Sequence, residues 1–190
     1  DAAILFSDIL TIPDSFGLGV EFIEKEGPVF RNPISNSTDI KNLNHFDPES
    51  LDYVYKAVNN IKSSLPEEIP LIGFCGSPWT LAAYSIEGRS SKDFEKTLGF
   101  LESNQKDVHD LLIKYTDACF LYLRKQVQSG ADVIQIFDSW ANLLTKEDLI
   151  EFSFNYINSL ISALKLDPIT KNIPVIIFAR NPKCNIEELI

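Results

Sequence analysis

The sequence predicts an α/β protein in which short buried strands alternate with longer helices. Four apolar runs indicate the strands, because each is too short for a typical helix and is continuous rather than alternating. They cover residues 2–6, 71–74, 133–137 and 175–178. Helical patterns separate them, which predicts β/α units and a parallel sheet. We expect these units to form about half of a (β/α)8 TIM-type barrel; an open doubly wound sheet is the alternative.

Capping residues and apolar side chains at helical spacing predict the helices. These are expected over about residues 48–64, 80–86, 92–102, 104–128 and 145–165. Asp47-Pro48 places a capping residue before a first-turn proline. Gly130 follows the longest helix and readily adopts the left-handed conformation that ends helices. Thr145 and Asp148 resemble a capping box at the start of the last helix.

The whole chain, residues 1–190, is expected to form part of a single barrel domain with a small insertion at about 11–46. Within the insertion, residues 20–23 and 29–30 flank Gly27-Pro28, which predicts a small hairpin. A composition of 45% hydrophobic and 23% charged residues is typical of a globular domain. The chain starts at Asp1 and contains no methionine, so we interpret it as an internal piece of a longer protein.

Charge and composition argue against several classes of protein. The formal net charge of -10 opposes nucleic-acid binding, which needs a basic face to neutralise phosphates. No apolar run approaches the roughly 20 residues of a membrane span, and the first twenty positions lack the basic start and uninterrupted apolar centre that are typical of a signal peptide. A cytoplasmic protein without a membrane or nucleic-acid partner is therefore expected.

The cysteines and histidines do not form the patterns of a disulfide framework or a metal site. Cys75, Cys119 and Cys184 are widely separated and form no Cys-x-x-Cys pair, so reduced thiols are expected. His45 and His109 lie far apart and have no companion ligand at a metal-binding spacing. We expect no metal.

Polar residues follow the predicted strands at their carboxyl ends, where barrel enzymes bind ligands. Asp8 follows an apolar run of five residues and Ser7, so its carboxylate needs donors or a cation. Capping of the next loop is the alternative to a catalytic role. Asp138 and Ser139 point to opposite sides of their strand, so only one of them can face the barrel mouth. Tyr84 can offer its hydroxyl to a bound acid, with a packed core tyrosine as the alternative.

Several segments of the sequence resemble one enzyme family, and the resemblance spans essentially all 190 residues. The segment GFCGSPWTL at residues 73–81 is similar to a long signature of uroporphyrinogen decarboxylases. Tyr84 and Glu87-Gly88 follow it and belong to the same signature. Residues 1–10 resemble the strand that carries the active-site aspartate of this family, and residues 135–141 resemble its serine-bearing strand.

The chain departs from the family pattern at a few positions. Arg89 and Asn142 stand where glycine is expected, and Arg180 stands where lysine is usual. The family's arginine-rich amino-terminal motif and its carboxyl-terminal histidine have no counterpart in the chain. The resemblance therefore predicts that this segment lacks part of the site and binds substrate poorly alone.

The resemblance implies a homodimeric decarboxylase that uses no metal or organic cofactor. Its substrate is uroporphyrinogen III, from which it removes four acetate carboxyl groups to give coproporphyrinogen III in porphyrin and heme biosynthesis. Asp8 matches the catalytic aspartate of the family, which accepts hydrogen bonds from pyrrole N–H groups and offsets the positive charge that develops on the ring. Tyr84 and Ser139 match substrate-binding residues. Phe6 and Phe137 would supply apolar walls for the macrocycle.

Two alternatives of different classes are kept open. A corrinoid- or thiol-linked methyltransferase can share the barrel, but it typically needs a zinc cluster of histidine and cysteine. A binding or scaffolding module that descends from the enzyme is the second alternative. The presence of Asp8, Tyr84 and Ser139 together favours an enzyme over a scaffold.

Overall fold

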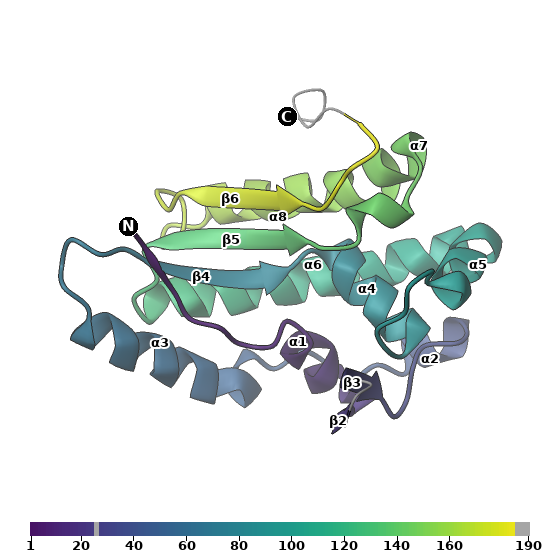
Figure 1. The fold of residues 1–190 in the computed structure, drawn as a ribbon, viewed down its shortest axis with the longest axis horizontal. Coiled ribbons are helices and arrows are strands. Elements are labelled where there is room, and N and C mark those ends of the chain that lie inside the picture. The colour runs from purple at the N-terminus through teal and green to yellow at the C-terminus, as the bar shows by residue number, and fades with distance from the viewer. Residues whose placement is uncertain (25–26, 185–190) are drawn as a thin grey trace.

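The centre of the molecule is a parallel sheet, as predicted. In the computed structural model, which describes residues 1–24 and 27–184, the strands lie in the order β1-β4-β5-β6 (Figure 1). Their bounds are Ala3–Ile4 (β1), Leu71–Gly76 (β4), Val133–Asp138 (β5) and Val175–Ala179 (β6). All adjacent pairs are parallel. The α/β class is thus confirmed, and the sheet is open, with β1 and β6 as its edges.

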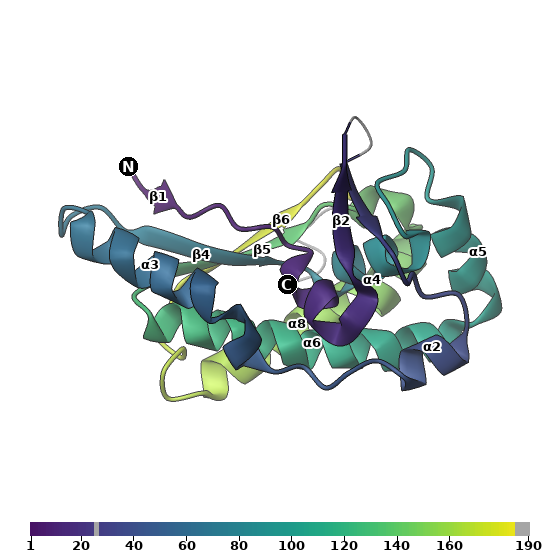
Figure 2. The ribbon, with the colours of Figure 1, turned by 90° about the horizontal axis from the view of Figure 1, so that it is seen from below.

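Helices cover one face of this sheet and leave the other face open. The long helices α3 (Asp52–Ser64), α6 (Gln105–Gln128) and α8 (Asn155–Leu166) lie on the same side (Figure 2). The side chains of β5 follow this arrangement, because Ile134 and Ile136 are buried while Val133 and Phe137 are partly exposed. The half-barrel therefore has a covered outer face and an accessible inner face.

α6 makes the largest contribution to the core. Its buried side chains include Leu111, Leu112, Tyr115, Cys119, Tyr122 and Leu123. The helix ends where predicted, with Gly130 at φ 114° just after it. Such a backbone conformation is strained for residues other than glycine.

Gln126 of α6 completes the hydrogen bonding of β4. β1 pairs with β4 only at Leu71 and Ile72, so it is shorter than the predicted run 2–6. Beyond that point the Gln126 side chain accepts from Phe74 N and donates to Phe74 O, both at 3.0 Å. A side-chain amide thus takes the place that a longer β1 would occupy.

The ends of the strands lead into capped helices. α4 (Pro78–Glu87) begins with Ser77, whose hydroxyl accepts from Thr80 N at 3.0 Å, and α5 (Glu95–Ser103) follows it. The predicted helix 48–64 consists of a 3-10 turn, η2 (Pro48–Leu51), and α3. The predicted helix 145–165 consists of α7 (Lys146–Asp148), a π-helical segment η4 (Leu149–Phe154) and α8, and Thr145 caps it.

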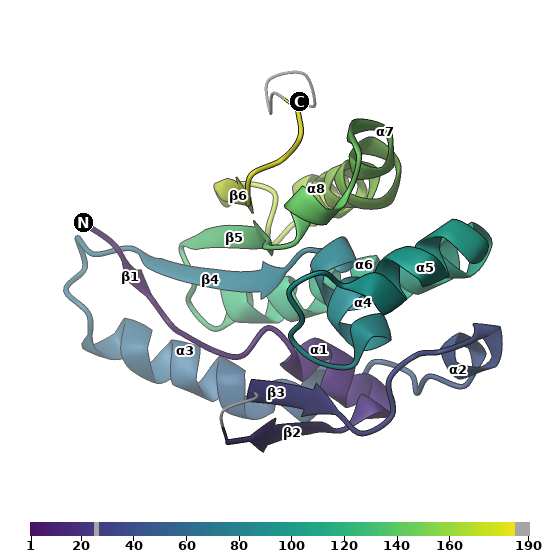
Figure 3. The same cartoon turned by 45° about the vertical axis from the view of Figure 1, so that its right-hand side comes forward.

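The insertion contains the predicted hairpin and short helices that were not predicted. β2 (Val20–Ile23) and β3 (Gly27–Phe30) pair antiparallel (Figure 3). Gly27-Pro28, expected to lie between the two strands, belong to β3 and pair with Ile23 and Phe22. The additional helical segments are α1 (Thr11–Pro13), η1 (Asp14–Leu18) and α2 (Ser37–Lys41). Backbone bonds from Phe30 N to Gly88 O and from Ile34 N to Ser85 O, both 2.8 Å, attach the insertion to the end of α4.

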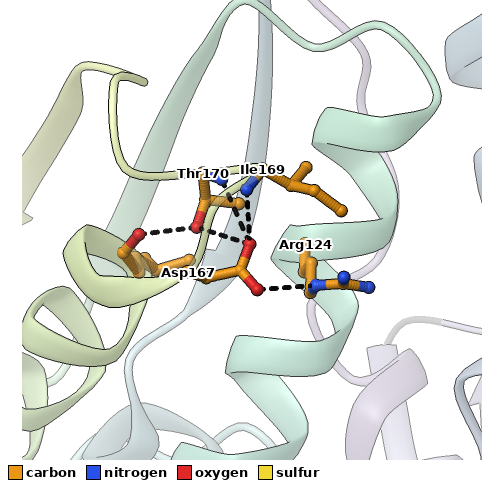
Figure 4. Close-up of polar contacts among 5 residues, drawn as sticks. Arg124, Asp167, Ile169 and Thr170 are labelled. Atoms are coloured by element: carbon orange, nitrogen blue, oxygen red, sulfur yellow. Dashed lines mark hydrogen bonds and ion pairs between the residues drawn. The ribbon is translucent and has the colours of Figure 1, made fainter.

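The turn between α8 and β6 is held by one carboxylate (Figure 4). Asp167 Oδ2 accepts from Arg124 Nε at 3.0 Å, and Oδ1 accepts from Ile169 N at 2.9 Å and Thr170 N at 3.2 Å. The buried Thr170 hydroxyl donates to Leu164 O at 2.6 Å. This network joins α6 to the connection that leads into β6.

Among the described helices, none is long and apolar enough to cross a membrane.

Candidate active site

A cavity of about 270 Å³ lies on the open face of the sheet, toward the carboxyl ends of β1, β4 and β5. It is lined by Ile4, Phe6, Ser7, Asp8, Ile9, Phe74, Phe137 and Ser139. Four of the five side chains expected at the site are therefore brought together, although up to 133 residues separate them in the sequence. The exception, Tyr84, is not among the lining residues.

Aromatic rings form the wall of this cavity. Phe74 lies between Phe6 and Phe137, with ring centroids 6.4 Å and 5.3 Å away, and Phe178 continues the row at 5.8 Å from Phe137. Phe6 is 84% exposed, so the wall is open to a ligand. Sequence reasoning did not single out Phe74 or Phe178. The signal that identifies them is that each of the four apolar runs ends in phenylalanine.

Asp8 is held by its own loop and also faces the cavity. Its Oδ1 accepts from Leu10 N at 2.8 Å, and its carbonyl oxygen accepts from the Thr11 hydroxyl at 2.9 Å. No residue that the structure describes donates a hydrogen bond to Oδ2. The loop-capping contact and a ligand-binding role are therefore compatible, because each uses a different carboxylate oxygen.

Of the two candidates at the end of β5, Ser139 lines the cavity and Asp138 does not. Asp138 is fully buried and accepts hydroxyl hydrogen bonds from Ser77 at 2.9 Å, Thr80 at 3.0 Å and Ser153 at 2.6 Å. Burial raises the pKa of Asp138, and the three hydroxyl bonds act in the opposite direction. Asp138 thus connects α4 and η4 to β5, and Ser139 is the side chain that a ligand can contact.

Tyr84 packs beside the site. Its ring centroid lies 5.8 Å from that of Phe94 and 5.7 Å from that of Trp140. Burial is the largest cause and raises the pKa of Tyr84, hydrogen bonds to Trp140 and Ser90 oppose it, and the negative charge of Asp8 adds a smaller upward effect. The Arg180 guanidinium lies 5.8 Å from the centre of the Trp140 ring. Binding of substrate by the Tyr84 hydroxyl stays a prediction.

The cysteines and histidines lie away from the cavity. Cys75 and Cys119 are buried free thiols, and burial raises the pKa of Cys119 well above its usual value. His109 Nδ1 lies 2.7 Å from the Tyr156 hydroxyl on the helical side of the molecule. Within residues 1–24 and 27–184, no group of three or more His, Cys, Asp or Glu side chains is placed to hold a metal ion.

Comparison with known proteins identifies the family. The family model described as "Uroporphyrinogen decarboxylase (URO-D)" matches residues 1–189. The chain belongs to the uroporphyrinogen decarboxylase family. It is 47% identical over 182 residues to the uroporphyrinogen decarboxylase of Pseudoalteromonas atlantica. The aligned region covers 95% of the chain and 51% of that protein. The uroporphyrinogen decarboxylase of Vibrio cholerae is 44% identical over all 190 residues, and 54% of it is covered.

The chain spans about half the length of these curated relatives of the family. Among solved structures, a methyltransferase from Methanosarcina mazei matches with a TM-score of 0.68 over 95% of the chain and 51% of that protein. The sequence identity is 16%, so this match supports the fold alone.

Proposed function

We propose that the full-length protein is a carboxy-lyase that removes the four acetate carboxyl groups of uroporphyrinogen III to give coproporphyrinogen III. The observation that carries this proposal is Asp8, whose carboxylate has one oxygen without a partner among the described residues and lines an aromatic-walled cavity together with Ser139. The family assignment supports the choice of substrate, because relatives at 44–47% identity carry the same name.

The proposed chemistry requires an electron sink beside each departing carboxylate. Protonation of a pyrrole carbon places positive charge on the ring. The bond between the acetate methylene carbon and its carboxyl carbon then breaks, CO₂ leaves, and the electron pair flows into the ring. A second proton then adds to the methylene carbon to form the methyl group, and the ring carbon releases its proton, which restores the neutral pyrrole. Asp8 accepts hydrogen bonds from the pyrrole N–H groups and stabilises the positive charge of the ring. This stabilisation is strongest where water is excluded.

The substrate also presents carboxylates that must be recognised. Ser139 and Tyr84 are proposed to donate hydroxyl hydrogen bonds to them, and Phe6, Phe74 and Phe137 are proposed to contact the macrocycle. The chain carries 17 Lys and Arg residues against 27 Asp and Glu residues. Most of the positive charge that eight carboxylates need is therefore proposed to come from the remainder of the full-length protein.

We further propose that the full-length protein is a cytoplasmic homodimer that needs no metal or organic cofactor and has no membrane or nucleic-acid partner. The resemblance to the family supports the dimer and the cofactor-free reaction. The net charge of -10 opposes nucleic-acid binding. Light scattering of the purified full-length protein would measure its oligomeric state, and a monomer at working concentration would contradict the proposed dimer.

Incubation of the full-length protein with uroporphyrinogen III tests the proposed activity. Products are separated by their number of carboxyl groups after oxidation to porphyrins. We expect a stepwise conversion from eight to four carboxyl groups that is unchanged by a metal chelator. A folded protein that leaves all eight carboxyl groups in place would contradict the proposal.

A further inference from the structure

We propose that Thr80 is a positioning residue that orients Ser139 toward the substrate. This inference rests on the proposed function, because it concerns the same cavity. Thr80 does not line the cavity itself and is fully buried in the first turn of α4. Its hydroxyl acts on the strand end that carries Ser139.

The Thr80 hydroxyl binds the residues on both sides of Ser139. It donates to Asp138 Oδ1 at 3.0 Å and accepts from Trp140 N at 3.3 Å. One hydroxyl can make both bonds, since it has one donor and two acceptor positions. The backbone that flanks Ser139 is therefore tied to a single side chain of α4.

Ser139 depends on these neighbours for its orientation. Its side chain makes no hydrogen bond with any residue of the described part of the chain, so the hydroxyl is available to a ligand. Two further bonds fix the same segment: Trp79 Nε1 donates to Trp140 O at 3.1 Å, and Arg180 N donates to Asp138 O at 3.0 Å. Thr80 is the residue in this set whose side chain contacts both flanking positions.

Removal of this hydroxyl can be matched closely with control variants. Thr80→Val keeps the shape of the side chain but loses both hydrogen bonds, whereas Thr80→Ser keeps the hydroxyl and loses a methyl group. Thr170→Val makes the same chemical change at another buried threonine, far along the chain in the α8–β6 turn (Figure 4). It controls for a general loss of stability.

The first measurement is the KM and kcat of the full-length protein for uroporphyrinogen III. We expect Thr80→Val and Ser139→Ala each to raise KM about tenfold with a smaller change in kcat, as expected for loss of a hydrogen bond to a charged ligand. Thr80→Ser should stay within about twofold of the wild type, and Thr170→Val should leave KM unchanged.

The double variant Thr80→Val/Ser139→Ala separates positioning from a general structural role. If Thr80 acts through Ser139, the double variant should have the KM of Ser139→Ala alone, because coupled residues give non-additive effects. Multiplied effects, or an equal rise of KM in Thr170→Val, would overturn the inference. If Thr80→Val does not fold, Thr80→Cys replaces it, since a thiol is a weak donor and acceptor, and an intermediate KM is then expected.

Hydrogen exchange of the Trp140 amide provides a measurement that needs no substrate. Thr80→Val should accelerate this exchange about tenfold, and Thr80→Ser and Thr170→Val should not. If the wild type does not decarboxylate uroporphyrinogen, the proposed function fails, and exchange alone decides whether Thr80 holds the segment. Unchanged exchange in Thr80→Val would overturn the positioning role whether or not the enzyme is active.

Discussion

A carboxylate can stabilise a cationic ring only if it is fixed in place and keeps an oxygen for the ligand. Asp8 meets both conditions, because Leu10 N binds one oxygen at 2.8 Å and the side chain still lines the cavity. Ser139 complements it with a hydroxyl that the described residues leave unbonded. Asp8 follows β1 and Ser139 follows β5, and these two strands are separated by β4 in the sheet. The fold, and not the local sequence, brings the two side chains to one cavity.

Tyr84→Phe is expected to be a mild change. The ring contacts with Phe94 and Trp140 remain, so stability should fall by less than about 1 kcal/mol, and KM should rise only a few-fold if the hydroxyl binds a substrate carboxylate. Thermal unfolding and steady-state kinetics of the full-length protein measure both. Tyr115→Phe is the control, because its buried hydroxyl lies 2.6 Å from Ser85 Oγ, away from the cavity. Unfolding of Tyr84→Phe would show a purely structural role.

The residues of the site differ in how far sequence could predict them. Asp8 and Ser139 follow apolar runs, and strand alternation required one member of the Asp138–Ser139 pair to face inward. Sequence could not say which one, because the choice depends on the three hydroxyls that surround Asp138. The role proposed for Thr80 was missed for the same reason: its partners lie about 60 residues away in the chain.

At the scale of the elements, α6 packs against the sheet, and Gln126 is its polar contact with β4. Gln126→Leu keeps most of the volume but leaves Phe74 N and Phe74 O without these bonds. We expect a loss of about 2–3 kcal/mol in the free energy of unfolding, measured in urea. Gln128→Leu, at an exposed position of the same helix, should change it by less than about 0.5 kcal/mol. Equal effects would contradict the role of Gln126.

The α8–β6 turn predicts a pH dependence. Burial alone would raise the pKa of Asp167, but hydrogen bonds from Arg124 and from the backbone of Ile169 and Thr170 lower it overall. A folded pKa below the unfolded value stabilises the fold above about pH 4, and this contribution is lost as the pH falls through the folded pKa. Asp167→Asn should therefore be less stable than the wild type at pH 7.

Urea unfolding between pH 3 and pH 7 measures this difference. The difference in unfolding free energy between the wild type and Asp167→Asn should shrink as the pH falls below about 4, since the Asp167 carboxylate is progressively protonated as the pH falls through its lowered folded pKa. Asp117→Asn, on an exposed position of α6, is the control. A gap that stays constant across this range would show that the charge of Asp167 contributes nothing.

Element positions were predicted well where local pattern decides them and poorly where pairing does. The apolar runs located β4, β5 and β6, but β1 pairs over two residues because Gln126 occupies the adjoining edge of β4. α2 was missed because five residues give no helical periodicity. Its capping box, Asn36 with Asp39, was the available signal.

At the scale of the whole molecule, the open face of the sheet exposes apolar side chains through which the chain can self-associate. Phe6 is 84% exposed, and Ile4, Ile176 and Phe178 are 43–48% exposed on the edge strands or just beyond them. Apolar patches and unpaired strand edges of this kind favour association. We expect a protein made of residues 1–190 alone to self-associate and to bind uroporphyrinogen poorly.

Charged substitutions on the open face test this expectation. Phe6→Lys with Phe178→Lys should reduce association of the 190-residue protein, measured by analytical ultracentrifugation, without loss of helical circular dichroism. Leu166→Lys is the control, because Leu166 is also 84% exposed but lies at the end of α8. An equal reduction by the control would show that association does not depend on the open face of the sheet.

The central claim, that the charge of Asp8 stabilises the reacting ring, is tested most directly by Asp8→Asn in the full-length protein. Asparagine can still accept from Leu10 N through its side-chain oxygen, so the turn is kept while the charge is lost. Asp14→Asn is the matched control, since Asp14 Oδ1 accepts from Val20 N at 2.8 Å outside the cavity. We predict that Asp8→Asn lowers kcat for uroporphyrinogen by about 10²–10³-fold or more with an unchanged melting temperature, while Asp14→Asn stays near wild-type activity. Full turnover by a folded Asp8→Asn protein would contradict the account.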